Sequence, residues 1–196
     1  MDFAKLINTV KEIILEPKNA FTKRKEEKEP WMNLLVNYVL ILVAISAIGS
    51  FLSMIGWSAS WAIRSLIMQL IIGVVNFIIL MYLMQALSKS FGGNGDLEQS
   101  AKTIAYSLTP SWVGSFFTFI PFLGWLIALA GLIYSLYVLY HAILIFMDVP
   151  KDKSVGYEII FIIVSIVVMA VVGFTLGAIF GLGFLGAGAM HGGWRF

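Results

Sequence analysis

The chain is dominated by apolar runs, each about as long as a lipid bilayer is thick. A helix needs about 20 predominantly apolar residues to cross the hydrocarbon core of a bilayer. With 60% hydrophobic and only 12% charged residues, a water-soluble fold would lack the polar residues to cover its surface. The sequence therefore predicts an all-α integral membrane protein, a bundle of five transmembrane helices with an amino-terminal amphipathic interfacial helix. The predicted spans are residues 31–56, 65–87, 102–120, 122–146 and 157–181.

Lys and Arg residues are distributed unevenly between the connections of these runs. Residues 1–30 hold seven of them, and the connections on either side of the third and fourth runs hold four more: Lys89, Lys102, Lys151 and Lys153. Only Arg64 and Arg195 lie in the remaining segments. By the positive-inside rule, we expect a multi-pass protein of the cell (plasma) membrane, with its amino terminus cytoplasmic and its carboxyl terminus external.

Residues 2–15 carry apolar side chains at helical spacing, with charged side chains toward the other face, and Pro17 ends this segment. Such a helix can lie in the membrane interface with its apolar face toward the lipid, or it can dock a soluble partner. Residues 1–30 are then this helix and a charged linker, residues 31–188 the transmembrane domain and residues 189–196 a short external tail. The predicted membrane-facing residues are Phe3, Leu6, Ile7, Val10 and Ile14.

Pro110 interrupts the third apolar run. A proline within a helix removes the hydrogen bond that the carbonyl four residues earlier would accept, which here belongs to Tyr106. The sequence therefore predicts a kink, with Tyr106 and Pro110 as hinge residues. A static kink that improves packing is the alternative.

Polar side chains and glycines within the spans predict contacts between helices. Amides, hydroxyls and an imidazole at membrane depth either form interhelical hydrogen bonds or line a polar route through the bundle. The candidates for that route are Gln69, Asn76, Tyr106, Ser107, Tyr137 and His141. Gly173, Gly177 and Gly181 recur at four-residue intervals, a pattern typical of close helix packing within a bundle or between protomers. We therefore expect membrane lipids, and a second copy or another membrane protein, as partners.

The chain shows no arrangement typical of an enzyme. It has no cysteine, no nucleophile motif and no metal-ligand spacing, and its carboxylates all lie outside the deep parts of the predicted spans. We therefore expect no catalytic site, no cofactor and no metal, and the net charge of +2 gives no indication of nucleic-acid binding. The favoured hypothesis is a non-enzymatic protein that organises or remodels the membrane or scaffolds partners. The alternative is a small channel or transporter that uses the polar route.

The order of certain residues along the chain carries a resemblance. The amino-terminal segment contributes Glu16, Pro17, Lys18, Phe21 and Trp31, and later segments contribute Gly92, Gly93, Gly95, Ala105, Tyr106, Pro110, Ile120, Pro121, Leu123, Gly124, Trp125, Tyr134, Ser135, Leu136, Tyr137, Tyr140, Val149, Pro150, Lys151 and Gly156. In this order and spacing, residues 10–180 resemble the Yip family of Ypt/Rab GTPase-interacting membrane proteins, in a compact prokaryotic form.

The resemblance implies a five-span bundle with a cytoplasmic amino terminus, and a link to vesicle trafficking and membrane shaping in eukaryotic members. The chain lacks their long acidic amino-terminal region with its D-L-P-P-E-Y type motif. GTPase binding is therefore not carried over.

Overall fold

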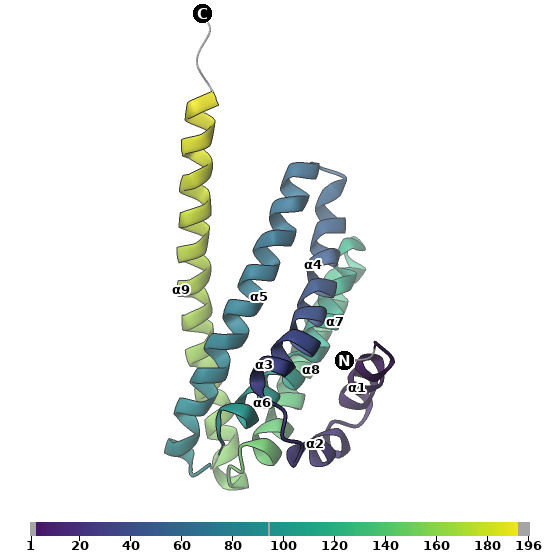
Figure 1. The fold of residues 1–196 in the computed structure, drawn as a ribbon, viewed down its shortest axis with the longest axis vertical. Helices are drawn as coiled ribbons and strands as arrows, with labels where there is room; N and C mark the ends of the chain where they lie inside the picture. Colours follow the sequence, from purple (N-terminus) through teal and green to yellow (C-terminus); the bar gives the residue numbers. More distant parts are fainter. Residues whose placement is uncertain (1–2, 94, 192–196) are drawn as a thin grey trace, which may run out of the picture. The chain divides into compact units, whose positions relative to one another are not determined.

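The computed structural model describes residues 3–93 and 95–191, and every element in this part of the chain is helical (Figure 1). The chain divides into two compact units, Met1–Phe161 and Ile162–Phe196. The site described below lies within the first. The elements are α1 (Phe3–Leu15), α2 (Pro17–Lys25), α3 (Trp31–Leu34), the π-helical turn η1 (Leu35–Val39), α4 (Leu40–Ile55), α5 (Ala59–Ser88), the 3₁₀ turn η2 (Lys89–Phe91), α6 (Leu97–Ser107), α7 (Thr109–Phe116), the 3₁₀ turn η3 (Phe117–Phe119), α8 (Leu123–Phe146) and α9 (Lys151–His191).

Four helical stretches in the described residues are long and apolar enough to cross a membrane. They are Trp31–Ile55, Ala59–Phe91, Leu123–Phe146 and Lys151–Thr175, with mean hydropathies between 1.9 and 2.7. These stretches correspond to the first, second, fourth and fifth predicted spans. The all-helical fold with long apolar helices is therefore as predicted, whereas the third predicted span is not among these four stretches.

The third apolar run forms two helices, α6 and α7, instead of one kinked helix. Pro110 lies in the first turn of α7, where its missing N–H costs nothing because that N–H would have no partner in the helix. Side chains replace hydrogen bonds at the break: the Thr109 hydroxyl donates to the Ala105 carbonyl at 3.0 Å, and the Ser111 N–H donates to Ser135 Oγ at 3.0 Å. The backbone therefore changes helix at Leu108 without leaving these polar groups unpaired.

Helix α6 forms the centre of the first unit. All of its residues from Ser100 to Ser107 are buried, and it packs against α3, α5 and α8. Its hydroxyls bond within the helix, since Thr103 Oγ1 donates to the Gln99 carbonyl at 2.8 Å and Ser107 Oγ to the Thr103 carbonyl at 2.5 Å. Small side chains with satisfied hydroxyls allow this helix to be surrounded by protein on all sides.

Helices α7 and α8 are packed backbone to backbone. A Cβ atom added to Gly131 would lie 2.5 Å from the carbonyl oxygen of Pro110, and one added to Gly114 would lie 2.9 Å from that of Ile127. The two helices are joined by a tight turn in which the Leu123 N–H donates to the Pro121 carbonyl at 2.7 Å. This turn places Phe122 at φ 63° and ψ −57°. The hairpin fixes α7 along the amino-terminal half of α8.

Candidate functional site

Helices α1 and α2 form a short hairpin that packs on the rest of the first unit (Figure 1). The turn between them follows from Pro17, which stops the preceding helix and occupies the first turn of α2. Ala20 and Phe21 of α2 are fully buried. Contacts of α2 with α8 and of α1 with α7 attach the hairpin to the bundle. We name this element the amino-terminal hairpin, residues 3–25.

The apolar stripe of α1 is divided lengthwise by this packing. Leu6 and Ile13 face protein, with 2% and 0% of their surfaces exposed. On the adjoining edge of the stripe, Phe3 is 65% and Ile7 39% exposed. Val10 and Ile14 are half-buried between the two edges. Of the predicted membrane-facing residues, Leu6 is therefore buried against protein, and the outer edge is open at Phe3 and Ile7.

Lys102 holds the end of α2. Its side chain is 1% exposed, and its Nζ donates to three main-chain carbonyls: Arg24 at 2.9 Å, Lys25 at 3.4 Å and Glu27 at 2.5 Å. The last carbonyls of a helix have no partner within it and form its negative end. The Lys102 ammonium therefore supplies both the hydrogen bonds and the opposite charge that this helix end requires.

Three further polar contacts attach the hairpin. The Lys25 ammonium forms an ion pair with the Asp148 carboxylate, and Gln99 Nε2 donates to the Lys25 carbonyl at 3.1 Å. At the end of α1, the Tyr134 hydroxyl of α8 donates to the Ile14 carbonyl at 2.7 Å. These contacts involve both helices of the hairpin and three different parts of the bundle.

Within the hairpin, Arg24 joins the two helices. Its guanidinium donates to Glu12 at 2.7 Å, to Thr9 Oγ1 at 3.3 Å and to the Ala20 carbonyl at 3.0 Å. The hydrogen bond from Arg24 holds the pKa of the Glu12 carboxyl below its ordinary value. Lys23 lies 4.0 Å from the same carboxylate and favours the same ionised form.

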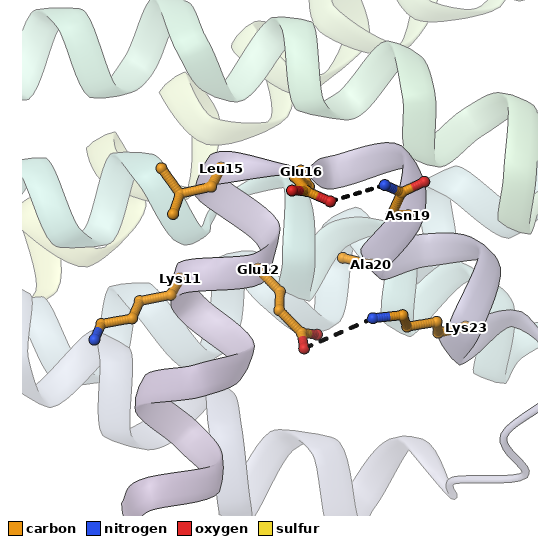
Figure 2. Close-up of a pocket in the computed structure, with 7 residues that line it drawn as sticks. All are labelled: Lys11, Glu12, Leu15, Glu16, Asn19, Ala20 and Lys23. Carbon is orange, nitrogen blue, oxygen red and sulfur yellow. Dashed lines mark hydrogen bonds and ion pairs between the residues drawn. The ribbon is translucent and has the colours of Figure 1, made fainter.

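A cavity of about 290 Å³ lies between α1 and α2 (Figure 2). The ion pair between Lys23 of α2 and Glu12 of α1 crosses the gap, and a hydrogen bond from Asn19 to Glu16 at 2.8 Å is formed at the start of α2. Each carboxylate of the cavity is thus already engaged by a residue of α2. We assign this cavity to the joining of the hairpin and not to a ligand. It is lined by Lys11, Glu12, Leu15, Glu16, Asn19, Ala20 and Lys23.

Tyr106, one of the two predicted hinge residues, lies in an aromatic cluster beneath α2. Its ring centroid is 6.2 Å from that of Phe21, 6.0 Å from that of Phe146 and 5.3 Å from that of Tyr38. The Tyr38 hydroxyl is 2.7 Å from Thr109 Oγ1, so the π-helical turn η1 contacts the break between α6 and α7. Pro110 is buried beside this break. Motion at Tyr106 and Pro110 stays a prediction.

Five of the six residues of the predicted polar route have a hydrogen-bond or ring partner. Gln69 Nε2 donates to Ser46 Oγ at 3.2 Å, and Ser107 bonds to a carbonyl of its own helix. His141 Nδ1 is 2.9 Å from the Tyr137 carbonyl, and the two rings lie 4.5 Å apart. Asn76 is half-buried, while Tyr106 belongs to the aromatic cluster. The structure therefore joins Tyr137 with His141, but pairs Gln69 and Ser107 elsewhere.

Of the three predicted packing glycines, the structure describes the surroundings of Gly173 alone. Among the described residues, a Cβ atom added to Gly173 would meet no atom within 4 Å. Gly177 and Gly181 lie outside the residues whose surroundings are described. Close helix packing is found instead at Gly114 and Gly131.

Sequence reasoning missed the most important residue of the site, Lys102, which was counted only as a cytoplasmic charge. One signal was available: Lys102 stands among Ser100, Ala101 and Thr103, small residues typical of a helix surrounded by protein. A lysine in such a helix needs buried acceptors. Asp148 and Tyr134 gave no comparable signal, because their partners are 123 and 120 residues away in sequence.

Gly93 and Gly95, in the connection after α5, pack closely against Met147, in the connection after α8. A Cβ atom on Gly93 would lie 2.6 Å from the Met147 carbonyl oxygen, and Gly95 contacts the Met147 side chain. The rings of Phe91 and Tyr157 are in tilted contact beside them, with ring centroids 5.1 Å apart. The carboxyl ends of α5 and α8 and the amino end of α9 are therefore held together.

These features define a helical, multi-pass membrane protein whose amino-terminal hairpin is bound to one end of its bundle. A family model described as the Yip1 domain matches residues 11–172. The chain belongs to this family. The matched region begins inside α1 and includes the hairpin contacts, the break at Leu108 and the glycine connection. Comparisons with curated proteins and with solved structures found no match.

Proposed function

We propose that this Yip1-domain protein is non-enzymatic and organises or remodels the bilayer, with α1 lying in the cytoplasmic interface of the plasma membrane. Family membership and the long apolar helices support a membrane role. The observation that carries the proposal is the divided stripe of α1, whose outer edge stays open at Phe3 and Ile7. An exposed apolar helix edge beside membrane-spanning helices inserts into the headgroup region of one leaflet.

The proposal includes five crossings. Gly93 touches Met147, so the carboxyl ends of α5 and α8 lie on the same side of the membrane. If α8 crosses, its amino end at Leu123 lies on the opposite side, and the chain between α5 and α8 must cross as well. Helices α6 and α7 therefore act together as the remaining span, with protein packed around α6.

The proposed orientation places the amino terminus and the Gly93–Met147 contact in the cytoplasm. This follows from the eleven Lys and Arg residues that lie in the amino-terminal stretch, at Lys89 and Lys102 after α5, and at Lys151 and Lys153 in the first turn of α9. The positive charges beside α1 also attract anionic headgroups of the inner leaflet. Charge and the open apolar edge thus favour the same surface.

The test is vesicle remodelling by the full-length protein. Purified protein is reconstituted at fixed protein-to-lipid ratio into liposomes containing anionic lipid, and vesicle shape and size are followed by electron microscopy and light scattering. The double substitution Phe3→Glu with Ile7→Glu places two charges on the open edge of α1. We expect it to reduce remodelling severalfold.

Ala4→Glu with Asn8→Glu is the matched control. It adds the same charge at the same spacing on an exposed side of α1 that lies about 100° around the helix from the open edge. We expect remodelling to be unchanged by this control. Equal effects of the two double substitutions, or none from either, would remove the support for an interfacial helix.

A further inference from the structure

The amino-terminal hairpin touches two apolar environments at once. Leu6 and Ile13 are buried against protein, while Phe3 and Ile7 are exposed. Lipid tails are as apolar as a protein core, so within a membrane apolar burial hardly distinguishes packing on protein from packing on lipid. The apolar stripe therefore gives little preference for keeping α1 on the bundle.

Polar contacts supply that preference. They consist of the three carbonyl hydrogen bonds of Lys102, the ion pair of Lys25 with Asp148, and the hydrogen bonds donated by Gln99 and Tyr134. Lys102 contributes most, because it is buried and a hydrogen bond from an ionised donor is about twice as strong as a neutral one. Lipid tails offer no replacement for any of these bonds.

The segment after α2 can act as the pivot. Residues 26–30 lie outside the helices, and all but the half-buried Glu29 are exposed. A hydrogen bond from the Glu29 N–H to the Glu27 carbonyl at 3.1 Å is formed within this segment. Moving the hairpin therefore requires rotations in a short solvated segment and leaves α3 and α4 in place.

From this division of roles we infer that the amino-terminal hairpin is releasable, with Lys102 as the contact that decides between a bundle-docked and a membrane-inserted state. In the docked state α1 presents only its outer edge to lipid. In the released state Leu6 and Ile13 enter the interface as well, which widens the apolar face inserted into one leaflet. The inference rests on the proposed function for what the released helix does, but not for the release itself.

Release is measured as a distance within the full chain. The sequence contains no cysteine, so spin labels can be attached at Asn8→Cys on α1 and Asp152→Cys at the start of α9, both exposed positions. Double electron–electron resonance in liposomes should give one narrow distance for the docked hairpin. Lys102→Met keeps the length of the side chain and removes the ammonium. We expect it to raise the undocked population roughly tenfold or more.

Two controls separate release from unfolding. Lys18→Met makes the same substitution on an exposed lysine of α2 and should leave the distance distribution unchanged. A second label pair, Ser60→Cys with Asp152→Cys, reports on the bundle without the hairpin. An unchanged bundle distance together with a broadened hairpin distance supports release.

A narrow hairpin distance in Lys102→Met, with the bundle distance also intact, would overturn the inference. If Lys102→Met changes the distance between the Ser60 and Asp152 labels, the inference is tested instead with the double substitution Lys25→Ala with Gln99→Ala. This variant breaks contacts at the surface of the bundle. Release in this variant supports the inference and a narrow distance overturns it. Loss of vesicle remodelling with release intact would count against the proposed function alone.

Discussion

Lys102 illustrates how one charged side chain can stabilise a helix on another part of the chain. Its ammonium meets three carbonyls at the end of α2, while Tyr106 and Phe146 cover the adjacent apolar surface of Phe21. The charged and aromatic contacts thus meet on the same nine-residue helix. The docking of α2 therefore depends on a few individual side chains, so single substitutions can test it.

Gly131 is expected to be essential for the packing of α7 on α8. Gly131→Ala would place Cβ 2.5 Å from the Pro110 carbonyl oxygen, which cannot move without separating the two helices. We expect the free energy of unfolding to fall by roughly 1–3 kcal/mol, measured by denaturant titration in mixed micelles. Gly173→Ala is the control, because its Cβ meets no atom within 4 Å. Equal losses in both variants would contradict the packing described here.

Glu12 predicts how docking responds to acid. Its pKa is lower in the folded chain than the ordinary value of 4.5, so its pairing with Arg24 stabilises the hairpin above the ordinary pKa. That contribution is lost as the pH falls through the lower, folded pKa. We expect the population with α1 displaced, read from the Asn8 and Asp152 labels, to rise as the pH falls below that ordinary value. Glu12→Gln should flatten this acid response, and an unaltered response would assign it to other groups.

At the scale of elements, the irregular segments are the informative ones. The π-helical turn η1, the break at Leu108 and the turn before α8 interrupt otherwise regular helices, and the first two meet through Tyr38 and Thr109. Sequence periodicity predicted the regular helices well, because membrane-length apolar runs have few alternatives to a helix. It placed the interruption near Pro110 but predicted one kinked helix. A new helix can start at the proline because side chains such as Ser135 satisfy the separated backbone groups, and Ser135 lies too far away in sequence for this contact to be predicted.

The turn before α8 carries a prediction of its own. Phe122 adopts φ 63° and ψ −57°, the rare γ-turn conformation, which is strained for a residue with a side chain. We expect Phe122→Gly to raise the free energy of unfolding by about 1 kcal/mol, because glycine adopts positive φ without that strain. Phe122→Ala removes the same exposed ring but keeps Cβ, so it should give no such gain. A matching gain from alanine would show that the ring, and not the backbone, is responsible.

At the scale of the whole molecule, the proposed number of crossings rests on charge distribution and on contacts together. Composition and charge predicted a helical membrane protein, and four of the predicted spans correspond to long apolar helices. The hairpin contacts could not be predicted, because the acceptors of Lys102 are main-chain carbonyls more than 70 residues away and any residue supplies them. The burial of Leu6 could not be predicted either, because helical periodicity shows an apolar face but not whether protein or lipid covers it.

Five crossings can be tested by accessibility in intact cells. Single cysteines are introduced at Ser60, Lys89, Phe122 and Asp152, all exposed positions. A membrane-impermeant maleimide should label Ser60→Cys and Phe122→Cys from outside, whereas Lys89→Cys and Asp152→Cys should react only after permeabilisation. Protection of Phe122→Cys would mean that α6 and α7 do not cross.

The seating of Gly93 and Gly95 against Met147 has a mechanical consequence. With the two connections in contact, the adjacent ends of α5 and α8 are restrained from tilting independently, so lateral pressure on either helix is transmitted to its neighbour. This contact keeps the cross-section of the protein constant at that end of the bundle. Lipids must then adapt their own spacing to the protein, and a dense array of these chains would impose that spacing over a continuous area.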